Sequence, residues 1–154
     1  MDFRREETRL TVNGERLDAQ EILQKGYVYI RRKWAAGDQV AICFPLEARR
    51  VYASQRVREN AGCVALLRGP VVYCFEGVDN GEMIQSLRIP RDAAIKPCVC
   101  EEGILKGNVL LKIEGCRMAG SGELYSEKPP VKEKAVLTAI PYYAWANRGE
   151  TQMR

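Results

Sequence analysis

The feature that most constrains the fold of this chain is a series of short apolar segments, each bounded by turn-forming residues. The segments include YVYIRRKW, QVAICF, GCVALL, VVYCFE, NVLLKIEG and KAVLTAI. Their alternation of apolar and polar residues is typical of β-strands, whose successive side chains point to opposite faces. Turn signals such as Asn13-Gly14 and Arg68-Gly69-Pro70 separate them. The pattern predicts an all-β fold with little helix, an antiparallel and jelly-roll-like β-sandwich.

Two local signals give more specific expectations. Asn13-Gly14, between LTV and ERL, predicts a type I′ hairpin because both residues tolerate a positive φ. The segment DAQEILQKG is the one hint of a helix, which Asp18 could cap and Gly26 could end. We therefore expect a hairpin near residue 13 and at most two helical turns over residues 18–26.

Composition excludes several classes of function. The 154 residues include no histidine, which rules out imidazole-based triads and histidine-containing metal sites within the chain. The net charge of +4 is spread along the sequence, whereas nucleic-acid-binding proteins usually show a dense basic face. No apolar run approaches the roughly 20 residues that cross a bilayer. The charged start MDFRREETRL is unlike a signal peptide. We expect no nucleic-acid or membrane partner and a cytoplasmic location.

The stretch RGPVVYCFEGVDN, residues 68–80, looks most like a site of chemistry. Cys74 and Glu76 are two residues apart, so both would lie on one face of a strand. A reactive thiol needs a histidine, a metal or a helix N-terminus to hold the thiolate, whereas a nearby carboxylate raises the thiol pKa. We therefore expect Cys74 to be a buried core residue between two turns, and no catalytic residue in this stretch.

The six cysteines raise the question of a metal site. Without a secretory signal they are expected to be reduced and mostly buried. Cys98 and Cys100 form a C-x-C pair, and Cys116 could add a third sulfur ligand. A structural zinc site usually has a second close pair of ligands, which is missing here. These three residues are weak metal candidates, and the expectation is that this chain holds no metal or other cofactor.

Aromatic residues are the remaining candidates for binding. Flat rings exposed on a β-sandwich can stack against sugars, although such rings more often pack in a core or an interface. The weak candidates for carbohydrate binding are Trp34, Tyr142, Tyr143 and Trp145.

Three blocks of the sequence resemble a known family. They are GYVYIRRKWAAGDQV, CVALLRGPVVYCFEGVDN and LTAIPYYAWANRGE, and with the residues around them they span about residues 10–154. In this order they resemble the C-terminal part of the β-L-arabinofuranosidases of glycoside hydrolase family 127. The resemblance implies a long parent protein, with an N-terminal (α/α)6 catalytic barrel followed by two β-sandwich domains.

The resemblance also implies where the chemistry of such a parent takes place. Members of the family use a zinc-bound cysteine nucleophile, with further cysteine and glutamate ligands and a glutamate acid/base, all in the barrel. The matched blocks belong to the sandwiches, so no catalytic residue is carried over to this sequence. The adjacent Cys-Cys pair of the family's zinc site does not occur here. Zinc is therefore expected in the catalytic domain of the parent.

From the same resemblance we expect three parts in this chain. These are a partial first β-sandwich (1–56), a second β-sandwich (57–139), and a C-terminal segment (140–154) that could return to the first. The expected function is that of a non-catalytic portion of a glycoside hydrolase, which supports the missing barrel and could contribute to a homodimer. The alternative is an independent carbohydrate-binding module that uses the exposed aromatic rings.

Overall fold

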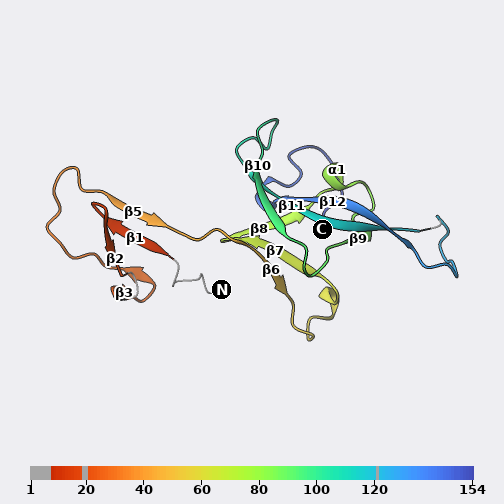
Figure 1. Ribbon diagram of the computed structural model, residues 1–154, viewed down its shortest axis with the longest axis horizontal. Helices are drawn as coiled ribbons and strands as arrows, with labels where there is room; N and C mark the ends of the chain where they lie inside the picture. Colours follow the sequence, from red (N-terminus) through yellow and green to blue (C-terminus); the bar gives the residue numbers. More distant parts are fainter. Residues whose placement is uncertain (1–7, 19–20, 121) are drawn as a thin grey trace. The chain divides into compact units, whose positions relative to one another are not determined.

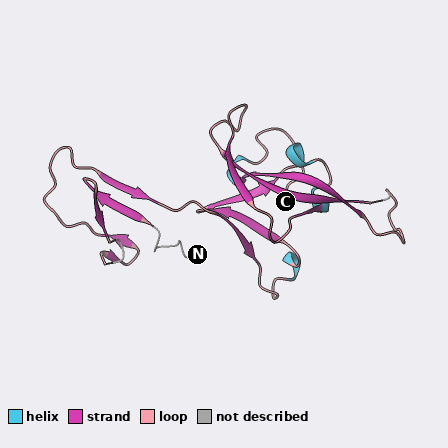
Figure 2. Ribbon diagram, in the orientation of Figure 1, coloured by secondary structure: helices cyan, strands magenta, loops and turns pink. Residues whose placement is uncertain are grey.

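The structure is a computed structural model that describes residues 8–18, 21–120 and 122–154. The chain forms two compact units, Met1–Glu47 and Ala48–Arg154. Nearly all regular structure in both units is antiparallel β-strand (Figure 2). The predicted all-β antiparallel fold with little helix is therefore confirmed.

The first unit holds two small antiparallel sheets. Its strands are β1 (Arg9–Val12), β2 (Glu15–Leu17), β3 (Leu23–Gln24), β4 (Tyr27–Val28) and β5 (Val40–Cys43). One sheet has the order β2-β1-β5, and the other pairs β3 with β4. The predicted type I′ turn joins β1 to β2, with φ values of 51° at Asn13 and 83° at Gly14.

The helix expected over residues 18–26 is wrong for the part that the structure describes. Gln24 pairs with Tyr27 across a tight hairpin instead. Lys25 and Gly26 have φ values of 51° and 87°, which a right-handed helix excludes and a two-residue hairpin turn requires. Residues 19–20 of that segment lie outside the described residues.

The second unit is built on one antiparallel sheet of seven strands. These are β6 (Ala48–Tyr52), β7 (Val64–Arg68), β8 (Val71–Phe75), β9 (Leu87–Arg88), β10 (Ile95–Val99), β11 (Val109–Ala119) and β12 (Val131–Pro141). Their order is β10-β11-β12-β8-β7-β6, and β9 also pairs with β11. The helical elements are short, namely α1 (Gly77–Asn80) and the 3-10 turns η2 (Arg58–Asn60), η3 (Ile84–Ser86) and η4 (Tyr142–Ala144).

The sheet curls around its core (Figure 1). One apolar cluster takes a side chain from each of the seven strands, which a flat sheet could not bring together: Ala48, Leu66, Tyr73, Leu87, Ile95, Leu111 and Leu137. A second cluster packs on the opposite face of β8 and β12 and contains Cys74, Leu105, Ile140 and Ala144. Both faces of β8 are therefore buried.

The division between the units differs from the boundaries expected from the sequence. The first unit ends at Glu47 and not at residue 56, because β6 pairs with β7 and so belongs to the second unit. Residues 140–154 also belong to the second unit. There, Phe75 exchanges two backbone hydrogen bonds with Arg154, at 2.8 and 3.1 Å.

Among the described residues, no helix is long and apolar enough to cross a membrane.

Candidate functional site

The end of β8 is tied to the C-terminal segment by a buried carboxylate. Glu76 has no exposed surface. Its Oε1 accepts a 2.8 Å hydrogen bond from the backbone N–H of Ala146, and its Oε2 accepts one of 2.5 Å from Nη2 of Arg148. Ala146 has a φ of 62°, an uncommon conformation for a residue with a side chain, and its N–H points at Glu76. Both oxygens of the carboxylate are thus occupied by the segment that follows η4.

Arg148 lies between two carboxylates. Its Nη1 donates a 2.9 Å hydrogen bond to Oδ1 of Asp79, and its Nη2 also contacts Oδ2 of Asp79. The hydrogen bonds to Asp79, and secondarily those to Glu76, hold the pKa of Arg148 above its usual value despite its partial desolvation. We call Glu76, Asp79, Ala146 and Arg148 the Glu76 clamp.

Asn80 completes the connection to the sheet. Its Nδ2 donates hydrogen bonds to the carbonyls of Glu76 and Thr138, at 2.9 and 2.8 Å, and its Oδ1 accepts one of 2.9 Å from the N–H of Thr138. Arg117 of β11 donates to the Asn80 carbonyl. Asn80 therefore joins the turn after β8 to Thr138 of β12. Thr138 lies just before Ala139, where the pairing of β12 with β8 begins.

Cys74 is held as a thiol. It is almost completely buried, and burial raises its pKa to about 11 from the ordinary 9.0, with a further contribution from the charge of Glu76. Arg148 acts in the opposite direction and does not compensate. Because the thiolate is the nucleophile, this cysteine is poorly suited to covalent catalysis near neutral pH. The core interpretation of Cys74 agrees with its place in the second apolar cluster.

We predict that Cys74 resists alkylation. At pH 8 a pKa of about 11 in place of 9.0 lowers the thiolate fraction about 100-fold, and burial lowers the rate further. The rate of Cys74 alkylation should rise about tenfold per pH unit as the pH approaches 11, because the thiolate forms only as the pH nears the raised pKa. Iodoacetamide labelling of the folded chain, read by peptide mass spectrometry, checks this with the exposed Cys43 as the internal control. Equal labelling of Cys43 and Cys74 at pH 8 would contradict the prediction.

The structure does not bring the three metal candidates together. Cys98 of β10 faces Leu110 across the β10–β11 pair, and Cys116 lies six residues further along β11. At about 3.3 Å per residue this separates them by roughly 20 Å, whereas sulfur ligands of one zinc lie within a few ångströms of each other. The Cys100 thiol instead donates to the carbonyl of Glu102 at 3.2 Å. These three cysteines therefore do not fit one zinc ion.

The four aromatic candidates fall in two places. Trp34 is in the first unit, is half exposed, and has the guanidinium of Arg32 over its ring at 5.3 Å. The other three lie together in and just after η4 in the second unit. Tyr142 and Trp145 stack with their ring centres 6.1 Å apart, and all three rings keep between 39% and 68% of their surface exposed. The Tyr143 hydroxyl donates to Oδ1 of Asn108 at 2.8 Å.

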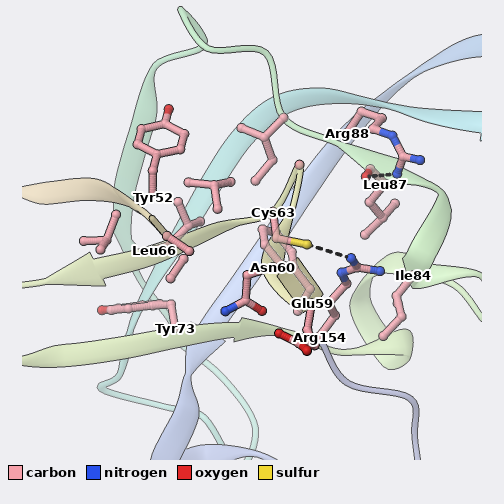
Figure 3. A pocket seen from close by; sticks show the side chains of 17 residues that line it. Tyr52, Glu59, Asn60, Cys63, Leu66, Tyr73, Ile84, Leu87, Arg88 and Arg154 are labelled. Atoms are coloured by element: carbon pink, nitrogen blue, oxygen red, sulfur yellow. Dashed lines mark hydrogen bonds between the residues drawn. The ribbon is translucent and has the colours of Figure 1, made fainter. Parts of the chain in front are cut away.

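The second unit also has a cavity of about 540 Å³ between β6, β7, β8 and the η3–β9 segment. Figure 3 shows Leu66, Tyr73, Ile84, Leu87 and Cys63 among the side chains that line it. Nη2 of Arg154 donates to the Cys63 sulfur at 3.0 Å. The cavity is mostly apolar, with a few polar groups at its wall.

Sequence reasoning missed Arg148 and the cavity. Glu76 lies in the stretch RGPVVYCFEGVDN and Arg148 in the block LTAIPYYAWANRGE, but the two residues are 72 positions apart, and no local signal pairs them. The lining of the cavity comes from segments spread between Val51 and Arg154. Only the curl of the sheet brings these segments together.

Comparison with known families assigns both parts of the chain. Residues 48–154 match the model of the glycoside hydrolase family 127 C-terminal domain. Residues 5–46 match the middle domain of the GH127 β-L-arabinofuranosidases. The boundary between these matches falls within two residues of the boundary between the two compact units.

The similar proteins that have been characterised or solved are much longer than this chain. The non-reducing end β-L-arabinofuranosidase of Bifidobacterium longum subsp. longum is 36% identical over 157 residues, which cover 94% of this chain and 23% of that protein. Ara127N-Se, a GH127 β-L-arabinofuranosidase from Geobacillus stearothermophilus T6, is 44% identical with a TM-score of 0.83, over 95% of this chain and 23% of that one. The GH127 β-arabinofuranosidase BT3674 is 33% identical with a TM-score of 0.81, over 96% and 22%. The chain therefore spans less than a quarter of the length of these relatives.

Proposed function

Because the chain belongs to glycoside hydrolase family 127, in which it corresponds to the middle and C-terminal domains, we propose that it is a non-catalytic portion of a β-L-arabinofuranosidase-like enzyme. Its role is to support the catalytic domain of a longer protein. The substrate class is taken from the names of the relatives, which are β-L-arabinofuranosidases.

The observation that carries this proposal is the burial of Glu76 and Cys74. They are the thiol and the acid that most resemble a catalytic pair, yet Glu76 is fully buried with both oxygens bonded, and the Cys74 thiol has a raised pKa. A general acid or nucleophile must reach its substrate. Here Glu76 holds the segment after η4, and Cys74 packs in an apolar cluster that includes Ala144 of η4.

The surface made by Tyr142, Tyr143 and Trp145 is the proposed contact for the catalytic domain. These rings lie on a short segment that the Glu76 clamp fixes at one end and β12 at the other. Partly exposed aromatic rings on a rigid support are typical of domain and protein interfaces. We propose that the partner is the (α/α)6 barrel of the parent chain, and that the zinc of such an enzyme is held by that barrel, since Cys98, Cys100 and Cys116 do not fit a zinc ion.

An activity assay tests the proposal directly. The 154-residue chain is incubated with p-nitrophenyl β-L-arabinofuranoside, with and without added zinc, and we expect no turnover above buffer. Circular dichroism and a thermal unfolding scan of the same sample serve as the control that the chain is folded. Measurable turnover that follows the purified chain would overturn the non-catalytic role.

The second candidate function is carbohydrate binding by the exposed rings, and the exposure of Trp34, Tyr142, Tyr143 and Trp145 favours it. Sugar faces stack on exposed aromatic rings, so binding should quench or shift tryptophan fluorescence. Titration with arabinan, using Trp145→Ala and Trp34→Ala to assign the signal, separates the two candidates. Saturable binding that Trp145→Ala abolishes would favour the binding module, and no binding would favour the domain contact.

A further inference from the structure

The cavity of the second unit has the size and the mixed lining of a small-molecule site. Its volume of about 540 Å³ falls within the roughly 300–1,000 Å³ that is usual for ligand pockets. It lies at the end of the curled sheet where β6 and β8 finish and β7 begins. The buried side chains of Leu66 and Ile84 form part of its apolar wall, and Leu87 adds to that wall.

The 3-10 turn η2 adds a polar wall with unused hydrogen-bonding capacity. Glu59 and Asn60 both line the cavity, and neither side chain has a hydrogen-bond partner among the described residues. The Glu59 carboxylate accepts hydrogen bonds, whereas the Asn60 amide both donates and accepts them. The two kinds of polar contact thus occur side by side. A ligand with several hydroxyl groups can use both, because each hydroxyl is a donor and an acceptor.

Strand β9 adds a donor whose position is restrained. Arg88 also lines the cavity, and its Nη1 donates to the carbonyls of Gln85 and Leu87 at 2.7 and 2.8 Å. These bonds hold the guanidinium and leave the donor capacity of Nη2 for a ligand. The guanidinium of Arg154 differs, because its Nη2 already donates to the Cys63 sulfur. Polar groups therefore reach the cavity from two separate segments, η2 and β9.

An exposed aromatic ring stands at the same cavity. Tyr52, at the end of β6, lines it and keeps 57% of its surface exposed. Tyr73 also lines it, but this ring is buried and its hydroxyl donates to the carbonyl of Val109 at 3.0 Å. Tyr52 is therefore the ring on which the apolar face of a ligand can pack.

From these features we propose that the cavity binds a single ring of a neutral sugar. A purely apolar ligand would remove Glu59 and Asn60 from water without giving them a partner, which is unfavourable. The opposite charges of Glu59 and Arg88 favour neither an anion nor a cation. A sugar satisfies the polar side chains with its hydroxyls and packs its C–H face on Tyr52. The proposal goes beyond both functions proposed above, because the lining includes neither the Glu76 clamp nor the exposed rings considered there.

Cys63 reports on occupancy, since its side chain lines the cavity. The folded 154-residue chain is treated with iodoacetamide at rising concentrations of L-arabinose, a neutral pentose, and peptide mass spectrometry follows the labelling rate. At ten times its dissociation constant the sugar should slow the labelling of Cys63 about tenfold, because about one site in eleven stays free. The exposed Cys43 of the first unit is the internal control and should keep its rate.

The concentration range makes this test decisive. At about 100 mM L-arabinose, even a site with a dissociation constant of about 10 mM is about nine-tenths filled. A Cys63 rate that stays constant up to that concentration would overturn the proposal. Equal slowing of Cys43 and Cys63 would also overturn it, because the sugar would then act on the reagent or the solvent and not at the cavity.

Two variants identify the side chains that hold the sugar. Tyr52→Ala removes the exposed ring and Asn60→Ala removes the amide, and each should raise the dissociation constant about fivefold or more. Tyr125→Ala is the matched control, since Tyr125 is 93% exposed and lies outside the cavity. Circular dichroism shows whether each variant is folded. If the folded Tyr52 and Asn60 variants protect Cys63 as well as the control does, the sugar does not bind through this wall.

Two further ligands define the chemistry of the site. Cyclohexanol has a ring of similar size but one hydroxyl, so we expect it to protect Cys63 less than L-arabinose does. Stronger protection by cyclohexanol would refute a sugar site and show that the cavity takes apolar molecules. Arabinan distinguishes two sources of the sugar ring. Protection by arabinan supports a ring within a glycan, and protection by L-arabinose alone supports a free sugar.

Discussion

Replacement of Arg148 by methionine is expected to lower the free energy of unfolding of the second unit by about 3–5 kcal/mol, the range for removing one partner of a buried ion pair. The reason is the position of Glu76, whose side chain has no exposure and accepts a 2.5 Å bond from Arg148. Without the guanidinium, a buried carboxylate would keep one backbone N–H as its partner. Urea unfolding followed by tryptophan fluorescence measures the effect, since Trp145 lies three residues before Arg148.

Two further variants make this prediction specific. Lys96→Met removes the cation of an exposed pair with Glu114, at 3.4 Å, and should cost less than about 1 kcal/mol. Glu76→Gln combined with Arg148→Met removes the buried charge as well, so we expect it to recover part of the loss. If Arg148→Met costs no more than Lys96→Met, the Glu76 clamp does not hold the C-terminal segment.

Replacement of Asn80 by alanine is the second change with a large expected effect, about 2–4 kcal/mol. Asn80 is buried, and its side chain makes three hydrogen bonds to the backbone of Glu76 and Thr138. Alanine would leave the N–H and the carbonyl of Thr138 without that partner, whereas the Glu76 carbonyl would still accept from the backbone N–H groups of Asp79 and Asn80. Each buried unsatisfied group costs about 1–3 kcal/mol before water or relaxation compensates. Urea unfolding at neutral pH gives the measurement.

Asn60→Ala is the matched control for Asn80. Asn60 is exposed at the wall of the cavity, and a surface substitution of this kind usually changes stability by less than about 0.5 kcal/mol. Backbone amide exchange gives a second measurement, because the Thr138 N–H should lose protection in Asn80→Ala. Equal stability of the Asn60 and Asn80 variants would show that the turn after β8 does not depend on this side chain.

Much of the fold could be predicted because its signals are local. Alternating apolar residues specify strands, and Asn13-Gly14 specifies a hairpin through the backbone preferences of two residues. The helix over 18–26 was wrong because Lys25 and Gly26 adopt positive φ in a two-residue turn, which the pairing of Leu23 with Val28 stabilises.

The candidate site was predictable only in part. The sequence indicated that Glu76 would raise the pKa of Cys74, and the structure gives burial as the larger cause and Glu76 as the second. It could not give Arg148 as the partner of Glu76, nor could it separate Cys116 from Cys98 and Cys100. Those relations depend on the register of strands that are distant in sequence.

The sequence by itself therefore determined the strand class, the turns and the family, since these follow from backbone preferences and from short motifs. Only the tertiary structure decided what RGPVVYCFEGVDN does, because Cys74 is buried against Leu105, Ile140 and Ala144, and Glu76 is bonded to Ala146 and Arg148, all of which are distant in the sequence. The pairing of β8 with β12 brings the second and third of the three family blocks together, so that the second supplies the carboxylates and the third supplies the arginine and the aromatic surface.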